Sequence, residues 1–171
     1  MGYFASDIIP LSIGTKWLYE INSGFINMDV KAEVVDSKNG DALIKISGGK
    51  KEGAVVLKSD IDLSITAYSK KSINTLDNPN AFQIISKTTI LRSPVVTGTN
   101  WQNEYGTFTV IDSRYSLRSK SKVYLDCIFM QLKDTSRGNN DFYFKEGIGL
   151  LYASLHIDNI GKVNLNLKKF N

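Results

Sequence analysis

The sequence predicts an all-β fold, a single domain whose curved antiparallel sheet forms a sandwich or a partly open barrel. Apolar and polar residues alternate with a period of two along most of the chain, which is typical of half-buried strands. Turn residues such as Asn39-Gly40 separate these alternating segments, and Asn-Gly favours tight hairpins. No segment of about ten residues or more carries the apolar face of a helix.

The first half of the chain is predicted to be a meander. Residues 16–22 alternate so that Trp17, Tyr19 and Ile21 share one face. Further strands are expected at 25–35, 42–47, 54–58 and after Asp60, where Ile61, Leu63 and Ile65 would face one way. Residues 70–80 are polar without an apolar period, so we expect the longest loop there, with a short helical turn.

The second half continues with alternating segments at 82–91, around Trp101, and at 107–113, 114–117, 122–132, 140–145, 150–157 and 162–168. The last two are expected to pair across a turn at 158–161. We expect residues 1–8 to be an N-terminal extension, which a removed leader could precede, and residues 9–171 to form the domain.

Composition excludes several classes of protein. The 171 residues are 42% hydrophobic and 22% charged, with a formal charge of +4, which is not the composition of a disordered or collagen-like chain. One cysteine excludes an intrachain disulfide and a cysteine-based zinc cluster. No apolar run approaches the roughly 20 residues of a membrane-spanning helix. We expect no cofactor and no metal.

A short pattern occurs twice. Pro10, Gly14 and Trp17 belong to a Pro-x-x-x-Gly-Thr-x-Trp segment that recurs, 84 residues further on, with Pro94, Gly98 and Trp101. Proline sets an extended approach, glycine permits a tight bend, and tryptophan enters the core just after it. We interpret the repeat as two similar corners packed on one sheet.

Other residues extend this pattern into a resemblance. Residues 10–19 read Pro-Leu-x-x-Gly-x-x-Trp-x-Tyr, and residues 143–150 read Tyr-x-x-x-Gly-x-Gly-Leu, ending on Gly147 and Gly149. With the repeated corner and Cys127 between them, this order resembles a family of secreted or lipid-anchored, lipoprotein-type β domains of Gram-positive bacteria. The resemblance implies an antiparallel β fold and an extracellular or cell-envelope location, with a lipid anchor in the full-length protein. It implies no reaction.

Catalytic residues are hard to find. His156 is the only histidine, and it alternates with Leu155 and Ile157, so we expect it on the exposed face of a strand. Cys127 lies among apolar neighbours and is expected in the core, because free cysteines are usually buried. We therefore expect that this protein is not an enzyme and has no catalytic residues.

One candidate surface is basic. Arg114, Arg118, Lys120 and Lys122 all occupy even positions, so an unbroken strand or hairpin arm would place them on one face, opposite Val123. Such a stripe could bind a cell-wall polymer, an anionic membrane surface or another envelope protein. The alternative is a solvated face that protects a sheet edge. Nucleic acid is the weakest partner, because no series of aromatic residues accompanies the stripe.

Three functional hypotheses follow from these patterns. The first is a non-catalytic cell-envelope domain with a binding or structural role. The second is a carrier, whose curved sheet holds a lipid or other apolar ligand against a face bearing Trp17 and Trp101. The third, ranked last, is an enzyme that depends on Cys127 or His156.

Overall fold

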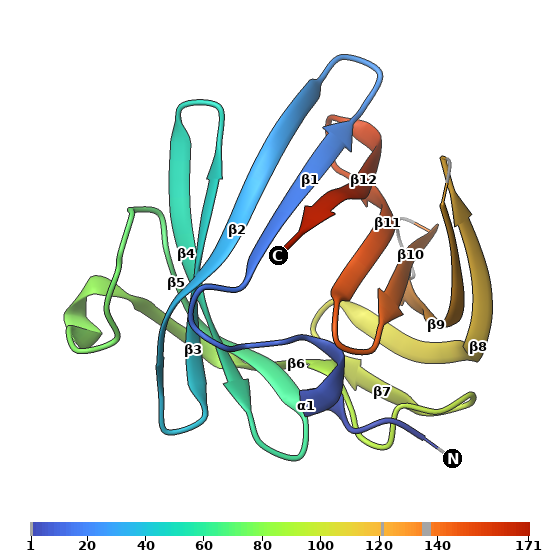
Figure 1. The fold of residues 1–171 in the computed structure, drawn as a ribbon, viewed down its shortest axis with the longest axis horizontal. Helices are drawn as coiled ribbons and strands as arrows, with labels where there is room; N and C mark the ends of the chain where they lie inside the picture. Colours follow the sequence, from blue (N-terminus) through green and yellow to red (C-terminus); the bar gives the residue numbers. More distant parts are fainter. Residues whose placement is uncertain (1, 121, 135–137) are drawn as a thin grey trace.

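Twelve strands account for most of the chain in a computed structural model that describes residues 2–120, 122–134 and 138–171 (Figure 1). The first half contains α1 (Ala5–Ile8), β1 (Lys16–Asn22), β2 (Asn27–Lys38), β3 (Asp41–Gly48), β4 (Lys51–Ser59), β5 (Leu63–Ser69), the 3-10 helix η1 (Pro79–Ala81) and β6 (Gln83–Leu91). The second half contains β7 (Asn100–Asn103), β8 (Gly106–Ser119), β9 (Lys122–Asp134), β10 (Gly138–Lys145), β11 (Gly149–Ile157) and β12 (Gly161–Phe170).

All twelve strands belong to one antiparallel sheet in the order β6-β5-β4-β3-β2-β1-β12-β11-β10-β9-β8-β7. Each half is therefore a six-stranded meander, and the pairing of β1 with β12 joins the halves. The two ends of the sheet come back together, because Trp101 Nε1 of β7 donates a hydrogen bond to the Thr89 carbonyl of β6 at 3.0 Å. The predicted curved sheet is confirmed as a nearly closed barrel (Figure 1).

The repeated corners have the same backbone geometry. Gly14 and Gly98 adopt φ values of 92° and 96°, which L-residues with a side chain rarely adopt. The Gly14 amide donates to the Val34 carbonyl at 2.8 Å, and the Gly98 amide donates to the Val110 carbonyl at 2.8 Å. In both corners the same valine donates back to the threonine that follows the glycine. Together with the strand order, these corners indicate an internal repeat of two meanders.

The interior of the barrel is filled by the inner faces of both meanders. Its main apolar cluster includes Trp17, Trp101, Phe108 and Met130. Burial of this cluster is the main stabilising contribution, since removing apolar surface from water drives folding. The N-terminal segment joins this core, because Ala5 and Ile8 are fully buried.

The outer face of the sheet is covered in two places. The loop after β5 places Ile73 and Leu76 over a cluster around Leu43. In the second half, the β8–β9 hairpin bends, as register shifts in β8 and the positive φ of Asp126 show. Its far half crosses the outer face, because Lys120 reaches Glu20 of β1 although β10, β11 and β12 lie between β9 and β1 in the sheet.

Most predicted strands are confirmed with small shifts at their ends. The segments expected at 107–113 and 114–117 form one bent strand, β8. The long loop contains the expected helical turn as η1. The predicted placement of Ile61 was wrong. Its side chain is 77% exposed in the turn before β5, whereas Leu63 is buried, because a turn closed by a hydrogen bond between Asp60 and Asp62 delays the start of the strand.

In the described ranges, no helix has the length and apolar content to span a membrane.

Candidate functional site

The motif of residues 10–19 contacts the motif of residues 143–150. Trp17 Nε1 donates a hydrogen bond to the Ile148 carbonyl at 2.6 Å, and the Tyr19 hydroxyl donates to the Leu150 carbonyl at 2.9 Å. Gly149, at φ 97°, lies against the Trp17 indole. Burial raises the pKa of Tyr19, so its hydroxyl stays protonated as a donor. Trp17 and Tyr19 of β1 therefore hold the Gly-x-Gly turn between β10 and β11 in place, which is a structural role.

Both tryptophans lie inside the packed interior. Trp17 and Trp101 are 4% and 5% exposed. The Trp101 ring stacks on Phe108 with centroids 5.3 Å apart, and Trp17 lies 6.1 Å from Phe170. A ligand that contacted the buried ring faces would have to displace core side chains. Core side chains thus cover most of both rings, and the apolar-ligand face expected at these residues stays a prediction.

Cys127 and His156 lie in different environments. Cys127 is fully buried in a cluster with Leu117 and Leu151, as predicted. Burial raises the pKa of its thiol, which keeps it protonated at neutral pH and lowers its reactivity. His156 is exposed near the end of β11, opposite Lys162 of β12. Among the described residues, no group of three or more His, Cys, Asp or Glu could hold a metal ion.

The four-residue basic stripe does not form a single face. Arg118 pairs directly with Val123 across the hairpin, so these two side chains share a face. Lys122 pairs with Ser119 instead and points to the other side. The expectation that Arg118 and Lys122 lie together opposite Val123 was wrong, because the hairpin turns between them and reverses the phase. Arg114 is exposed on the bent part of β8.

Lys120 and Lys122 instead lie near β12, and Lys120 also contacts β1. They line a groove of about 260 Å³ with Tyr124, Asn166 and Lys168. Lys120 adopts a positive φ of 49° in the turn and binds Glu20 at 2.8 Å. This contact joins the hairpin to β1, and the hairpin forms with β12 a basic groove that the stripe alone did not predict.

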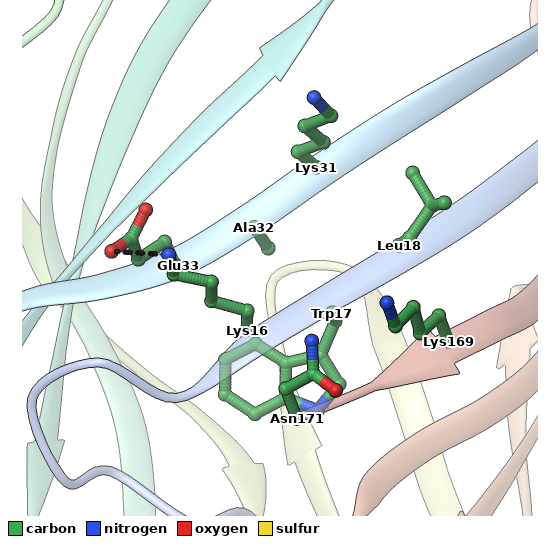
Figure 2. A pocket seen from close by; sticks show the side chains of 8 residues that line it. All are labelled: Lys16, Trp17, Leu18, Lys31, Ala32, Glu33, Lys169 and Asn171. Atoms are coloured by element: carbon green, nitrogen blue, oxygen red, sulfur yellow. Dashed lines mark ion pairs between the residues drawn. The ribbon is translucent and has the colours of Figure 1, made fainter.

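A second groove, of about 370 Å³, is also lined by residues of β12, together with residues of β1 and β2 (Figure 2). Leu18 lies opposite Lys31 of β2 on one side and Lys169 of β12 on the other. Figure 2 shows these residues with the ion pair between Lys16 and Glu33, whose atoms are 3.6 Å apart. The two grooves together present what we call the basic face: Lys16, Lys31, Lys120, Lys122, Lys168 and Lys169.

Acidic residues neutralise only part of the basic face. Glu33 pairs with Lys16, Glu20 with Lys120, and Asp29 with Lys168. The hydrogen bond from Lys120 lowers the pKa of Glu20, so this carboxylate stays charged. Within the described part of the chain, the remaining lysines of the face pair with no acidic side chain: Lys31, Lys122 and Lys169. The face therefore keeps an excess of positive charge in contact with solvent.

Sequence reasoning missed four members of this face: Lys16, Lys31, Lys168 and Lys169. They come from three strands, and only the pairing of β1 with β12 brings them together. Alternation along β1 does place Lys16 and Leu18 opposite Trp17, but it does not show which strand lies alongside.

Comparison with known proteins shows the fold. No family model matches the chain, and no curated protein matches it. A crystal structure of a candidate exported protein with a YmcC-like fold from Bacteroides fragilis covers 100% of both chains at 9% identity, with a TM-score of 0.55. A candidate lipoprotein from Parabacteroides distasonis covers 99% of both chains at 11% identity, with a TM-score of 0.51.

These similarities extend over the whole barrel, so the all-β architecture has solved counterparts. At such low identity they show the fold alone. Neither neighbour comes from a Gram-positive bacterium, so the Gram-positive origin and the motif match stay predictions.

Proposed function

We propose that this chain is a non-catalytic domain of the bacterial cell envelope that binds an anionic envelope polymer through the basic face. The observation that carries the proposal is the convergence of six lysines from β1, β2, β12 and the β8–β9 hairpin on two grooves that are both lined by β12. Three carboxylates offset half of that charge. An array of cations along grooves favours a polymer with repeated negative charges.

The envelope location is supported by two independent features. The two similar structures described above belong to a candidate exported protein and a candidate lipoprotein. The sequence motifs resemble secreted or lipid-anchored domains, which also suggests a lipid anchor in the full-length protein. A non-catalytic role is supported by the surroundings of Cys127. Its thiol is buried and protonated, whereas a catalytic cysteine attacks as the exposed thiolate.

Charge reversal on the basic face tests the binding role. The triple variant Lys31→Glu, Lys122→Glu, Lys169→Glu should weaken binding to purified lipoteichoic acid or lipopolysaccharide, each assayed separately by calorimetry. A lysine near an anionic surface contributes about 1 kcal/mol, so we expect a loss of roughly 100-fold or more. Wild-type binding should also weaken as salt is added.

A matched control separates a site from net charge. The variant Arg114→Glu, Lys58→Glu, Lys133→Glu changes the formal charge equally at exposed positions outside the two grooves. It should retain most of the binding. An equal loss in both variants, or no binding of either polymer by the wild type, would contradict the proposal.

A further inference from the structure

Two neighbouring hairpins expose apolar side chains at one end of the barrel. Because β1 pairs with β12, the β1–β2 and β11–β12 turns emerge side by side, at the top of Figure 1. Phe25 at the first turn is 90% exposed, and Ile26, Ile157 and Ile160 are also exposed. We call these four residues the apolar tips. These four side chains leave apolar surface in contact with solvent at two neighbouring turns.

The first tip is held in place by its own turn. The Ser23 hydroxyl accepts hydrogen bonds from the amides of Phe25 and Ile26 at 3.3 and 3.1 Å, and the Ser23 amide donates to the Ile26 carbonyl at 2.8 Å. This compact turn keeps Phe25 at the apex. The second turn is closed by a hydrogen bond from the Ile160 amide to the Ile157 carbonyl at 3.2 Å.

An open apolar groove lies on the inner face at the same end. It measures about 460 Å³, and its apolar lining includes Ile21, Met28, Val30, Ile46 and Val55. Ile46 is itself partly exposed. The apolar character of the tips therefore continues into the mouth of the barrel, whereas α1 packs at the opposite end (Figure 1).

Lysines lie at the same end of the barrel. Lys50 is in the β3–β4 turn and Lys51 begins β4, Lys70 and Lys71 follow β5, and Lys162 follows the second tip. Lys50, Lys70 and Lys71 line one shallow depression together with Glu52. Among the described residues nearest to these lysines in the sequence, the acidic ones are Glu52 of β4 and Asp158 of the β11–β12 turn. Positive charge thus predominates around the apolar tips.

We infer that this end of the barrel docks on a lipid bilayer that contains anionic phospholipids. Apolar side chains at protruding apexes can enter the boundary between headgroups and acyl chains, while lysines contact the anionic headgroups. A protein partner of ordinary interface size needs a broad complementary patch, but here the apolar residues stand on separate tips between cations. The docking end is distinct from the basic face, and the inference holds whether or not the chain carries a lipid anchor.

Vesicle flotation tests this inference with the purified chain. The probes are vesicles of phosphatidylcholine alone and of phosphatidylcholine with phosphatidylglycerol in equal parts. We expect binding to the anionic vesicles, and a loss of about 100-fold for Phe25→Ser combined with Ile160→Ser, because each change removes an inserted apolar group. The matched control Ile61→Ser with Leu125→Ser, which changes residues exposed elsewhere, should bind like the wild type.

Two further variants keep the outcome decisive. A Phe25→Trp variant should show a blue shift of its added tryptophan emission with anionic vesicles. The basic-face triple variant should keep its vesicle binding, so the inference and the proposed function can fail separately. The inference is overturned if the wild type does not bind anionic vesicles, if the tip variant binds equally well, or if only the basic-face variant loses binding. Gel filtration that shows a dimer disrupted by the tip variant would overturn it in favour of a second copy.

Discussion

The repeated glycine is the residue whose role the structure explains most directly. Gly14 adopts φ 92°, and beyond its chain neighbours no heavy atom lies within 4 Å of the position that a Cβ atom would occupy. The need for glycine is therefore conformational and does not come from crowding. Its counterpart Gly98 shows the same two features, so one explanation covers both corners.

We expect Gly14→Ala to lower the free energy of unfolding by about 1–2 kcal/mol, because an L-residue is strained at positive φ. Gly24→Ala is the control, since Gly24 has equally open surroundings but no positive φ, and it should leave stability nearly unchanged. Urea unfolding measures both. Equal destabilisation of the two variants would show that the corner has no special conformational demand.

Single residues were predicted well where a local rule applies. The burial of Cys127 and of both tryptophans follows from their apolar neighbours and alternation along a strand. The prediction that Arg118 and Lys122 share a face was wrong, because alternation applies within one strand and the turn between these residues changes its phase.

At the scale of elements, the loop after β5 is anchored by one carboxylate. Asp36 at the far end of β2 accepts a hydrogen bond from the Leu76 amide at 2.7 Å and another from the Ser37 amide at 2.9 Å. The Leu76 amide is the main reason that the pKa of Asp36 is lowered. The loop then places Leu76 over the outer apolar cluster around Leu43, so a long polar segment becomes part of the fold.

The lowered pKa gives this anchor a pH dependence. Because Asp36 binds protons more weakly when folded, its hydrogen bonds stabilise the protein fully above the unfolded pKa of about 3.9, and that stabilisation is lost as pH falls through the folded pKa. We expect the urea midpoint to drop less between about pH 7 and about pH 3 in Asp36→Asn than in the wild type. Asp41→Asn, at a carboxylate that accepts no hydrogen bond from any described residue, should keep the wild-type drop. Parallel curves for all three proteins would contradict the anchor.

At the scale of the whole molecule, the filled interior bears on whether the protein binds partners at its outer surface or encloses a ligand as a carrier. Trp17 and Trp101 are packed among core side chains, with their indole N–H groups hydrogen-bonded to carbonyl groups. This arrangement favours binding at the outer surface and at the barrel mouth over enclosure of a ligand beside the tryptophans.

We therefore expect weak quenching of tryptophan fluorescence by acrylamide in the folded protein, and strong quenching after unfolding in urea, because folding removes both indoles from solvent. Added phosphatidylglycerol vesicles should leave the wild-type emission unchanged even when they bind, since neither tryptophan lies at the apolar tips. Strong quenching in the folded state, or an emission shift with lipid, would support the carrier hypothesis.

Native mass spectrometry provides an independent check, and the chain without a bound ligand should appear at 19.1 kDa.

The sequence by itself determined the all-β class, the meander of the first half, the glycine and tryptophan corners and the buried cysteine, because each depends on a period of two or on a local φ value. Only the tertiary structure decided the pairing of β1 with β12, the basic face and the adjacent apolar tips. Lys120 and Glu20, for example, are 100 residues apart. Alternation fixes the face of a side chain along its own strand, but the neighbour across the barrel depends on how the whole sheet bends and closes.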